Sequence, residues 1–140
     1  MPGFAFKNAT YCVDVKAPSD ATDPETSVRG GLVFWLTDSG FFVVEIYLDG
    51  NYGVRRAVKD SDTAIVIPKA KFEKLKTGPG AGNEIKVTTL NNVVTLFFNG
   101  EKAKEFRAQA PKDGGKVGFY GESSPNQSNE WRFLDIVVNE

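Results

Sequence analysis

Four residues of this 140-residue chain combine side chains that could bind a polar ligand: Trp35, Glu45, Tyr47 and Arg55. An aromatic ring can cover the apolar face of a sugar, while carboxylate and guanidinium groups can hydrogen-bond its hydroxyls. All four fall in runs that alternate like β-strands, on the face opposite the apolar row. In neighbouring antiparallel strands such side chains can reach one another, so the pattern predicts a ligand-binding patch. The alternative is that the aromatic residues only cover the sheet and that Glu45 and Arg55 form an ordinary cross-strand ion pair.

Other chemistry is restricted by the residues that the sequence lacks. It has no histidine, which removes the usual nucleophile–base pairs and the commonest metal ligand. The only cysteine, Cys12, sits in an alternating run, where a structural role is expected. The acidic segments 20–25 and 60–62 could offer oxygen ligands to calcium, but their spacing matches no known calcium loop. We therefore predict no catalytic residue, no metal site and no cofactor.

Turn signals define the elements that must position the four residues. Asn, Asp and Gly tolerate the positive φ of tight hairpin turns. Between strand-like runs, four such turns are expected, at 38–40, 49–50, 90–93 and 99–100. Alternation in the flanking runs then assigns an inward apolar row. The row includes Phe42, Val44, Ile46, Leu48, Tyr52, Val54, Ile85, Val87, Leu96 and Phe98.

The remaining segments complete a single domain that spans residues 1–140. Further strands are expected at 116–120 and 131–138, and the N-terminal strand 10–16 is expected to pair with the last one. Residues 69–76 are compatible with either a short helical turn or a strand. Trp131 and Tyr120 are expected to be core or rim aromatic residues, and Lys86 and Phe97 would extend the patch only if their strands share its sheet.

The charge and hydrophobicity of the sequence limit which kinds of partner are expected. The net charge is −1, from 17 basic and 18 acidic residues, which gives no reason to expect nucleic acid as a partner. No apolar run approaches the roughly 20 residues of a membrane-spanning helix, so membrane insertion is not expected. The start of the chain lacks a signal-peptide pattern. It is therefore read either as cytoplasmic or as beginning after a cleaved signal.

The order of several segments resembles the concanavalin A-like lectin/glucanase superfamily, and most closely its laminin-G-like and 3-keto-disaccharide-hydrolase-type bacterial modules. The resemblance covers roughly residues 28 to 138. It is carried by Gly31-Leu32-Val33-Phe34, Phe41 to Ile46, Asp49 to Tyr52, Asn83 to Val87, Val94 to Gly100, Gly115 to Phe119 and Phe133 to Val138. The resemblance implies an all-β, two-sheet antiparallel jelly-roll sandwich whose face or rim could hold sugar.

The resemblance leaves three functions open. Glucanases of this fold usually place acidic residues at alternate positions of one strand, and this sequence has no such strand, which argues against a glycosidase-type hydrolase. A non-catalytic carbohydrate-binding or accessory module, with a glycan or polysaccharide as partner, is therefore the first hypothesis. A structural or protein-interaction module is the other alternative. The first hypothesis carries the expectation of an exported bacterial protein, extracellular or periplasmic.

Overall fold

The alternating runs form ten β-strands and no helix in the computed structural model, which describes residues 5–19, 28–122 and 130–140. The strands are β1 (Ala9–Lys16), β2 (Arg29–Thr37), β3 (Gly40–Tyr47), β4 (Asn51–Val58), β5 (Ala64–Lys71), β6 (Gly82–Leu90), β7 (Val93–Phe98), β8 (Glu101–Arg107), β9 (Lys116–Glu122) and β10 (Arg132–Asn139). Within these ranges no helix is long and apolar enough to cross a membrane.

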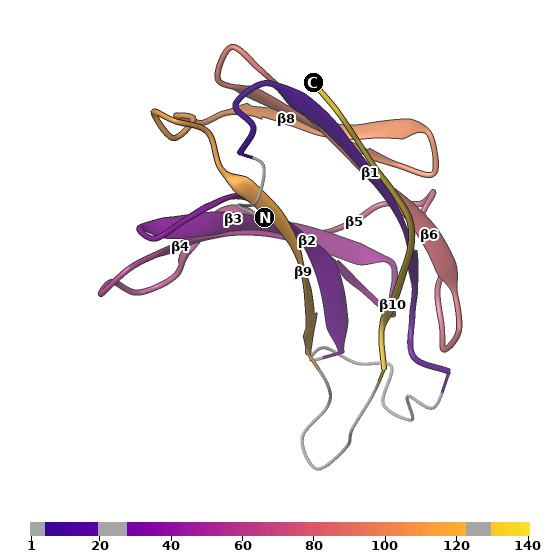
Figure 1. Cartoon of the computed structure of the whole chain (residues 1–140). Helices are drawn as coiled ribbons and strands as arrows, with labels where there is room; N and C mark the ends of the chain where they lie inside the picture. Colours follow the sequence, from indigo (N-terminus) through magenta and orange to yellow (C-terminus); the bar gives the residue numbers. More distant parts are fainter. Residues whose placement is uncertain (1–4, 20–27, 123–129) are drawn as a thin grey trace.

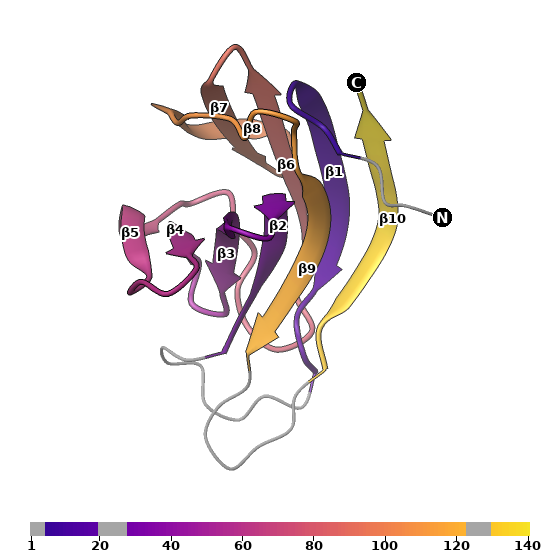
Figure 2. The same cartoon turned by 60° about the vertical axis from the view of Figure 1, so that its left-hand side comes forward.

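The strands build two antiparallel sheets, in the orders β10-β1-β6-β7-β8 and β5-β4-β3-β2-β9 (Figure 1). All four expected hairpin turns are confirmed, because each joins two strands that pair as antiparallel neighbours. The expected pairing of the terminal strands, β1 with β10, is confirmed too. Figure 2 shows the two sheets facing each other. The fold is the two-sheet antiparallel jelly-roll sandwich that the sequence predicted.

The tight turns have the backbone conformation that their residue types favour. Asn91 and Asn92, between β6 and β7, have φ values of 50° and 63°, and Asn99, between β7 and β8, has 54°. The Asn99 side chain also ties its turn to neighbouring segments: Oδ1 accepts from the Glu84 backbone N–H at 2.8 Å, and Nδ2 donates to the Lys74 carbonyl at 2.7 Å. These bonds satisfy backbone groups beside the turn.

The predicted apolar row forms the core between the sheets, except for Leu48, which belongs to a second, small cluster with Ala17 and Val28. All ten of its residues are buried, with Val44, Val54, Ile85, Val87, Leu96 and Phe98 fully covered. One edge of the sandwich is closed by Trp131, whose ring packs over Gly30 of β2 and Gly121 of β9. A Cβ atom on Gly30 would lie 2.5 Å from this ring, so the close packing requires glycine there.

The structure corrects the predicted position of Trp35. Alternation puts this side chain on the outer face, but the pairing of β2 shifts register between Phe34 and Thr37, and Trp35 takes the left-handed conformation with φ of 49°. An irregularity of this kind changes the face to which a side chain points. Trp35 is only 2% exposed and packs in the core, so its outward placement was wrong.

Two further differences concern strands. Residues 69–71 belong to β5, which begins at Ala64, so the undecided segment starts as an edge strand of its sheet. Pro68 is tolerated in β5 because an edge strand leaves some of its N–H groups unpaired. Lys86 and Phe97 lie on β6 and β7, in the other sheet from Glu45, and so cannot extend the predicted patch.

Candidate functional site

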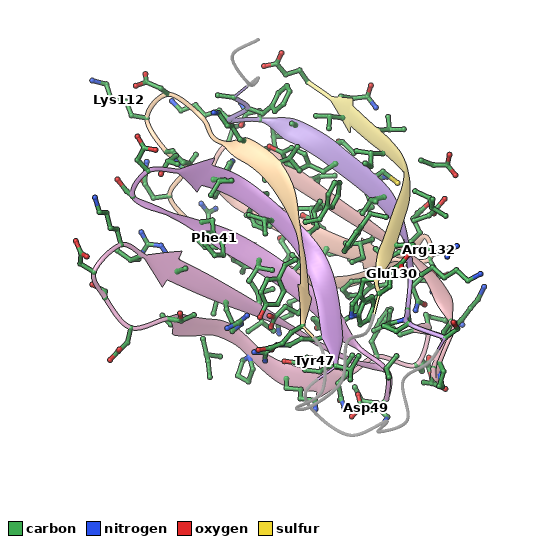
Figure 3. The ribbon with its side chains drawn as sticks, turned by 60° about the horizontal axis from the view of Figure 1, so that its bottom comes forward. Phe41, Tyr47, Asp49, Lys112, Glu130 and Arg132 are labelled. Carbon is green, nitrogen blue, oxygen red and sulfur yellow. The ribbon has the colours of Figure 1, made fainter. Side chains whose placement is uncertain are left out.

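A cluster of charged and tyrosine side chains lies on the outer face of the β5-β4-β3-β2-β9 sheet. We call it the Glu45 cluster; it comprises Arg29, Glu45, Tyr47, Arg55, Lys69, Tyr120 and Glu122. Five strands contribute to it, and pairing fixes the register: Glu45 lies opposite Gly31 of β2 and Gly53 of β4, and Gly31 lies opposite Tyr120 of β9. Figure 3 places Tyr47 toward the end of β3, close to Asp49.

The two glycines explain how the cluster assembles. Because Gly31 and Gly53 have no side chains, the positions on both sides of Glu45 are open. Arg29 stands two residues from Gly31 on β2, and Arg55 stands two residues from Gly53 on β4. Such diagonal neighbours on one face lie within reach of long side chains, so both guanidinium groups can extend over Glu45.

Glu45 is the buried centre of the cluster, with 1% of its surface exposed. Arg55 donates from Nε to both carboxylate oxygens at 3.0 Å, and its Nη2 forms a short contact to Oε1. The Nε of Arg29 lies 3.5 Å from the same Oε1, and the Tyr47 hydroxyl donates to Oε2 at 3.5 Å. Burial of a carboxylate is tolerated because it is paired and hydrogen-bonded in this way.

Arg29 links the centre to the edge of the sheet. Its Nε lies 2.6 Å from Oε2 of Glu122 on β9, and its Nη1 donates to the Tyr47 hydroxyl at 3.2 Å. Partial burial lowers the pKa of Arg29 and of Arg55, but hydrogen bonds and the charge of Glu45 outweigh this, and both pKa values are raised. Both guanidinium groups therefore stay charged.

The tyrosine rings are positioned by cations. The Arg55 guanidinium lies 5.4 Å from the ring centre of Tyr120, and Lys69 Nζ lies 4.3 Å from that of Tyr47. Such contacts fix the orientation of a ring by electrostatic attraction. Lys69 also pairs with Asp49 at 3.5 Å. Burial raises the pKa of Asp49, but the backbone N–H of Asn51 and two lysines outweigh it, so the pKa lies below its usual value.

Three of the four predicted residues, Glu45, Tyr47 and Arg55, therefore meet on one face, and Trp35 does not. Sequence reasoning missed Arg29, Lys69 and Glu122, and it assigned Tyr120 to the core or rim, whereas the ring is half-buried beside Arg55. The sequence could have shown that Arg29 belongs to this face. The 38–40 turn sets the register of β2 against β3, and Arg29 is then on the same face as Gly31, two residues away. The position of β9 beside β2 had no local signal.

Other chemistry finds little support in the described ranges. Burial and the neighbouring Glu84 raise the pKa of the Cys12 thiol, which disfavours a reactive thiolate. The described residues hold no group of three or more His, Cys, Asp or Glu side chains suited to a metal. Residues 20–25, one of the two acidic segments considered for calcium, lie outside the described residues. Glu45 is covered by its partners, so its carboxylate could not reach a scissile bond without displacing them.

Comparison with known proteins establishes the fold of this chain. No protein-family model and no curated protein matches this sequence. Among solved structures, the carbohydrate-binding module CBM66 from Bacillus subtilis matches with a TM-score of 0.67 at 8% identity, over 98% of this chain and 78% of that one. A tetrameric galectin from the ball sponge Cinachyrella sp. matches with a TM-score of 0.70 at 13% identity, over 97% and 94%. Sheep galectin-11, in complex with glycerol, gives 0.61 at 16%, over 97% and 93%.

These matches define the class of protein by architecture. The chain has the jelly-roll β-sandwich fold found in lectin-type proteins, with two antiparallel sheets of five strands in its described residues.

Proposed function

We propose that this protein is a non-catalytic carbohydrate-binding module and that the Glu45 cluster is its glycan-binding surface. The observation that carries the proposal is the buried Glu45 carboxylate, which holds the partly exposed guanidinium groups of Arg29 and Arg55 in fixed orientations. Planar polar groups that are positioned before the ligand arrives bind hydroxyl groups with little loss of side-chain entropy. The carbohydrate-binding module and galectins of the same fold support the proposal.

The residues of the cluster have different roles in this proposal. Glu45 is a positioning residue, because its carboxylate is covered by its partners. The groups that meet a ligand are Arg29 and Arg55, whose side chains are 22% and 26% exposed, and the half-buried ring of Tyr120. Trp35 has no part in this surface, because it lies in the core.

The charge of the cluster favours a neutral glycan. Arg29, Arg55 and Lys69 supply three positive charges, and Glu45, Glu122 and the adjacent Asp49 supply three negative charges. With its cations already paired, the surface offers hydrogen bonds without a net field that would concentrate an acidic polysaccharide. Hydroxyl groups are therefore the expected contacts.

Two narrower expectations are still predictions: the affiliation with laminin-G-like or 3-keto-disaccharide-hydrolase-type modules, and a bacterial, extracellular or periplasmic origin. Of the alternative functions, a hydrolase is disfavoured because Glu45 is covered and ion-paired. A protein-interaction module would use a flat apolar patch, whereas the Glu45 cluster is charged.

The test is a glycan array and polysaccharide pull-down of the wild type beside Tyr120→Ala and Arg55→Lys. Arg55→Lys keeps the charge but loses the two-pronged contact to Glu45. We expect both variants to weaken retention of a neutral glycan by about tenfold or more. Phe97→Ala is the matched control, because Phe97 lies under Lys86 on the outer face of the other sheet, with Nζ 5.0 Å from the ring centre. Absence of any retained glycan contradicts the function, and equal loss in Phe97→Ala contradicts the site.

A further inference from the structure

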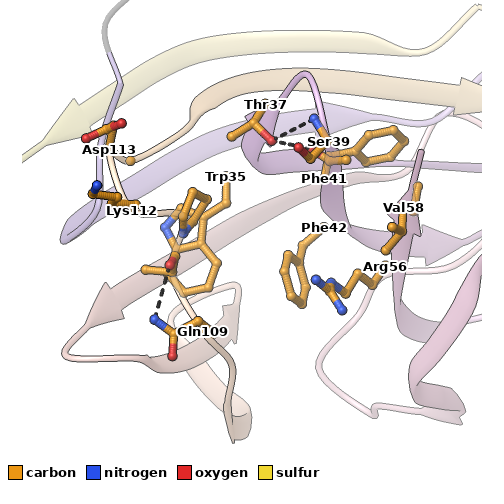
Figure 4. A pocket seen from close by; sticks show the side chains of 15 residues that line it. Trp35, Thr37, Ser39, Phe41, Phe42, Arg56, Val58, Gln109, Lys112 and Asp113 are labelled. Atoms are coloured by element: carbon orange, nitrogen blue, oxygen red, sulfur yellow. Dashed lines mark hydrogen bonds between the residues drawn. The ribbon is translucent and has the colours of Figure 1, made fainter. Parts of the chain in front are cut away.

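A pocket of about 520 Å³ lies at the end of β2, β3 and β4, beside the segment 109–114 (Figure 4). Its aromatic wall is already covered: the ring centres of Trp35 and Phe42 are 5.6 Å apart, and the Arg56 guanidinium lies 5.6 Å from the Phe42 ring. Both rings are buried, at 2% and 7% exposure. In the described strands, unpaired backbone is found instead at the edges of the two sheets.

Four strands form these edges: β10 and β8 in one sheet, and β5 and β9 in the other. Edge strands expose backbone N–H and C=O groups, and proteins protect them with bulges, prolines and lysines. β10 has a register shift against β1 and a positive φ at Asp135, β5 contains Pro68, and β8 carries the exposed Lys102 and Lys104. β9 contains neither a proline nor an extra residue, because the irregularity in its pairing with β2 lies in β2, and its one lysine, Lys116, stands at its first position. Among these four edges, β9 is therefore the least protected.

The charged residues of β9 match those of a second β9 strand. Two copies that pair antiparallel about Phe119 place Lys116 of each copy directly opposite Glu122 of the other. Alternation puts both side chains on the outer face of the sheet, where opposite charges stabilise a strand pair. Lys116 is exposed and forms no salt bridge with any described residue, while Glu122 contacts Arg29 and is 43% exposed. The charges of this strand are thus complementary to themselves.

The uncharged residues fit in the same register. Tyr120 of one copy lies opposite Gly118 of the other on the outer face, and Val117 lies opposite Gly121 on the inner face, so each larger side chain meets a glycine. Packing within one chain does not require glycine at 118, since a Cβ atom there would lie 3.8 Å from the nearest atom, Val33 Cβ. Glycine in a strand often marks a place where another backbone approaches closely.

Phe119 lies at the centre of this register. Its ring stacks on Phe133 of β10, with ring centres 4.7 Å apart, but 40% of the residue is exposed. In the pair, the two Phe119 side chains lie directly opposite each other, and an aromatic pair at such a position stabilises antiparallel strands. β10 runs along the same side of the sandwich (Figure 2) and exposes Leu134, Ile136 and Val137. Apolar surface is therefore available beside the β9 edge.

We propose that β9 is a dimer interface, at which two copies of this chain pair antiparallel about Phe119. The interface is isologous and closed, because the same strand of each copy forms both halves of it. It joins the two β5-β4-β3-β2-β9 sheets into one continuous sheet of ten strands, five from each copy. The twofold axis is perpendicular to this sheet, so both Glu45 clusters lie on the same side of it.

The pairing also adds a residue to each Glu45 cluster, because Lys116 of one copy lies beside Glu122 of the other. Two binding surfaces on one side would engage one polysaccharide at the same time, which raises the avidity. This consequence rests on the proposed glycan-binding function, whereas the pairing of β9 does not.

The test is sedimentation equilibrium of the whole chain without glycan, at protein concentrations from about 1 μM to about 1 mM. We expect a monomer–dimer equilibrium between 15.3 kDa and twice that mass, with a dissociation constant of about 100 μM or below. Hydrogen exchange gives a second measurement: the β9 amides should exchange more slowly at high concentration, and the β8 amides should not change. A constant mass of one chain, or β9 exchange that is independent of concentration, would overturn the proposal.

Lys116→Glu puts like charges opposite each other at both ends of the strand pair and should weaken the dimer about tenfold or more. Lys104→Glu is the matched control, because it makes the same change of charge on β8, another edge strand; it should change the dissociation constant by less than about twofold. Both lysines are exposed, so the fold should be retained. A dimer that Lys116→Glu leaves intact, or that both substitutions weaken equally, contradicts pairing through β9. Since no glycan is present, this result is independent of the glycan array.

Discussion

Glu45→Gln isolates what the buried carboxylate contributes to the fold. The substitution keeps the size of the side chain and removes its charge. Arg55, which contacts both carboxylate oxygens, would then lose its counter-charge, and Arg29, which contacts one, would keep only Glu122 of β9. Removing one partner of a buried ion pair destabilises a protein by roughly 3–5 kcal/mol. Because both arginines are about a quarter exposed and can regain water, we expect about 3 kcal/mol.

Urea denaturation measures this loss. With a dependence on urea of about 1–3 kcal/mol/M for a small protein, the midpoint should fall by on the order of 1–3 M. The control is Glu105→Gln, because Glu105 and Lys102 form an exposed pair at 3.4 Å with more than half of each side chain in water. That pair should contribute less than about 1 kcal/mol. Equal midpoints for Glu45→Gln and Glu105→Gln would refute the reasoning.

A double-mutant cycle separates the pair from other effects of the substitution. Arg55→Gln alone should also destabilise, because it leaves Glu45 with Arg29 as its remaining cation. Combining Glu45→Gln with Arg55→Gln should recover part of the loss, with a coupling energy of about 2 kcal/mol. Strict additivity of the two losses would show that the contact does not stabilise the fold.

The remaining predictions concern packing, titration and a turn. Gly31→Ala should destabilise by about 3 kcal/mol in urea denaturation, because its Cβ would lie 1.9 Å from the Val44 carbonyl oxygen, whereas Gly82→Ala, with no atom within 4 Å, should be nearly neutral. Burial raises the pKa of Tyr11 from 10.0 to about 12, so folding favours the neutral phenol; the contribution of Tyr11 to stability should be fully present below pH 10 and be lost as pH rises toward 12, and Tyr11→Phe should make the fall in stability over this range smaller. Asn99→Ala should lower the free energy of unfolding by about 2 kcal/mol, because alanine tolerates positive φ poorly and cannot form the side-chain hydrogen bonds to Glu84 and Lys74. Asn99→Gly should recover only the part of this loss that comes from the backbone conformation.

The hairpins could be read from the sequence because their causes are local. A turn at Asn99-Gly100 needs residues that tolerate positive φ, and the burial of Phe42, Val44 and Ile46 follows from alternation along one strand. Glu45, Tyr47 and Arg55 could be grouped for the same reason. The predicted turn at 49–50 places β4 beside β3, and alternation puts the three side chains on one face.

Tertiary structure decided what depends on contacts between distant segments. The shift of register within β2 turned Trp35 into the core, and no residue type near it indicated an irregular strand. Tyr120 and Glu122 joined the cluster only because β9 pairs with β2, about ninety residues apart in sequence. The sequence by itself therefore determined the strands other than β5, the four tight turns and most of the faces. The members of the Glu45 cluster on β9 and the burial of Trp35 were decided by pairing and packing, which act across the fold and leave no local pattern in the chain.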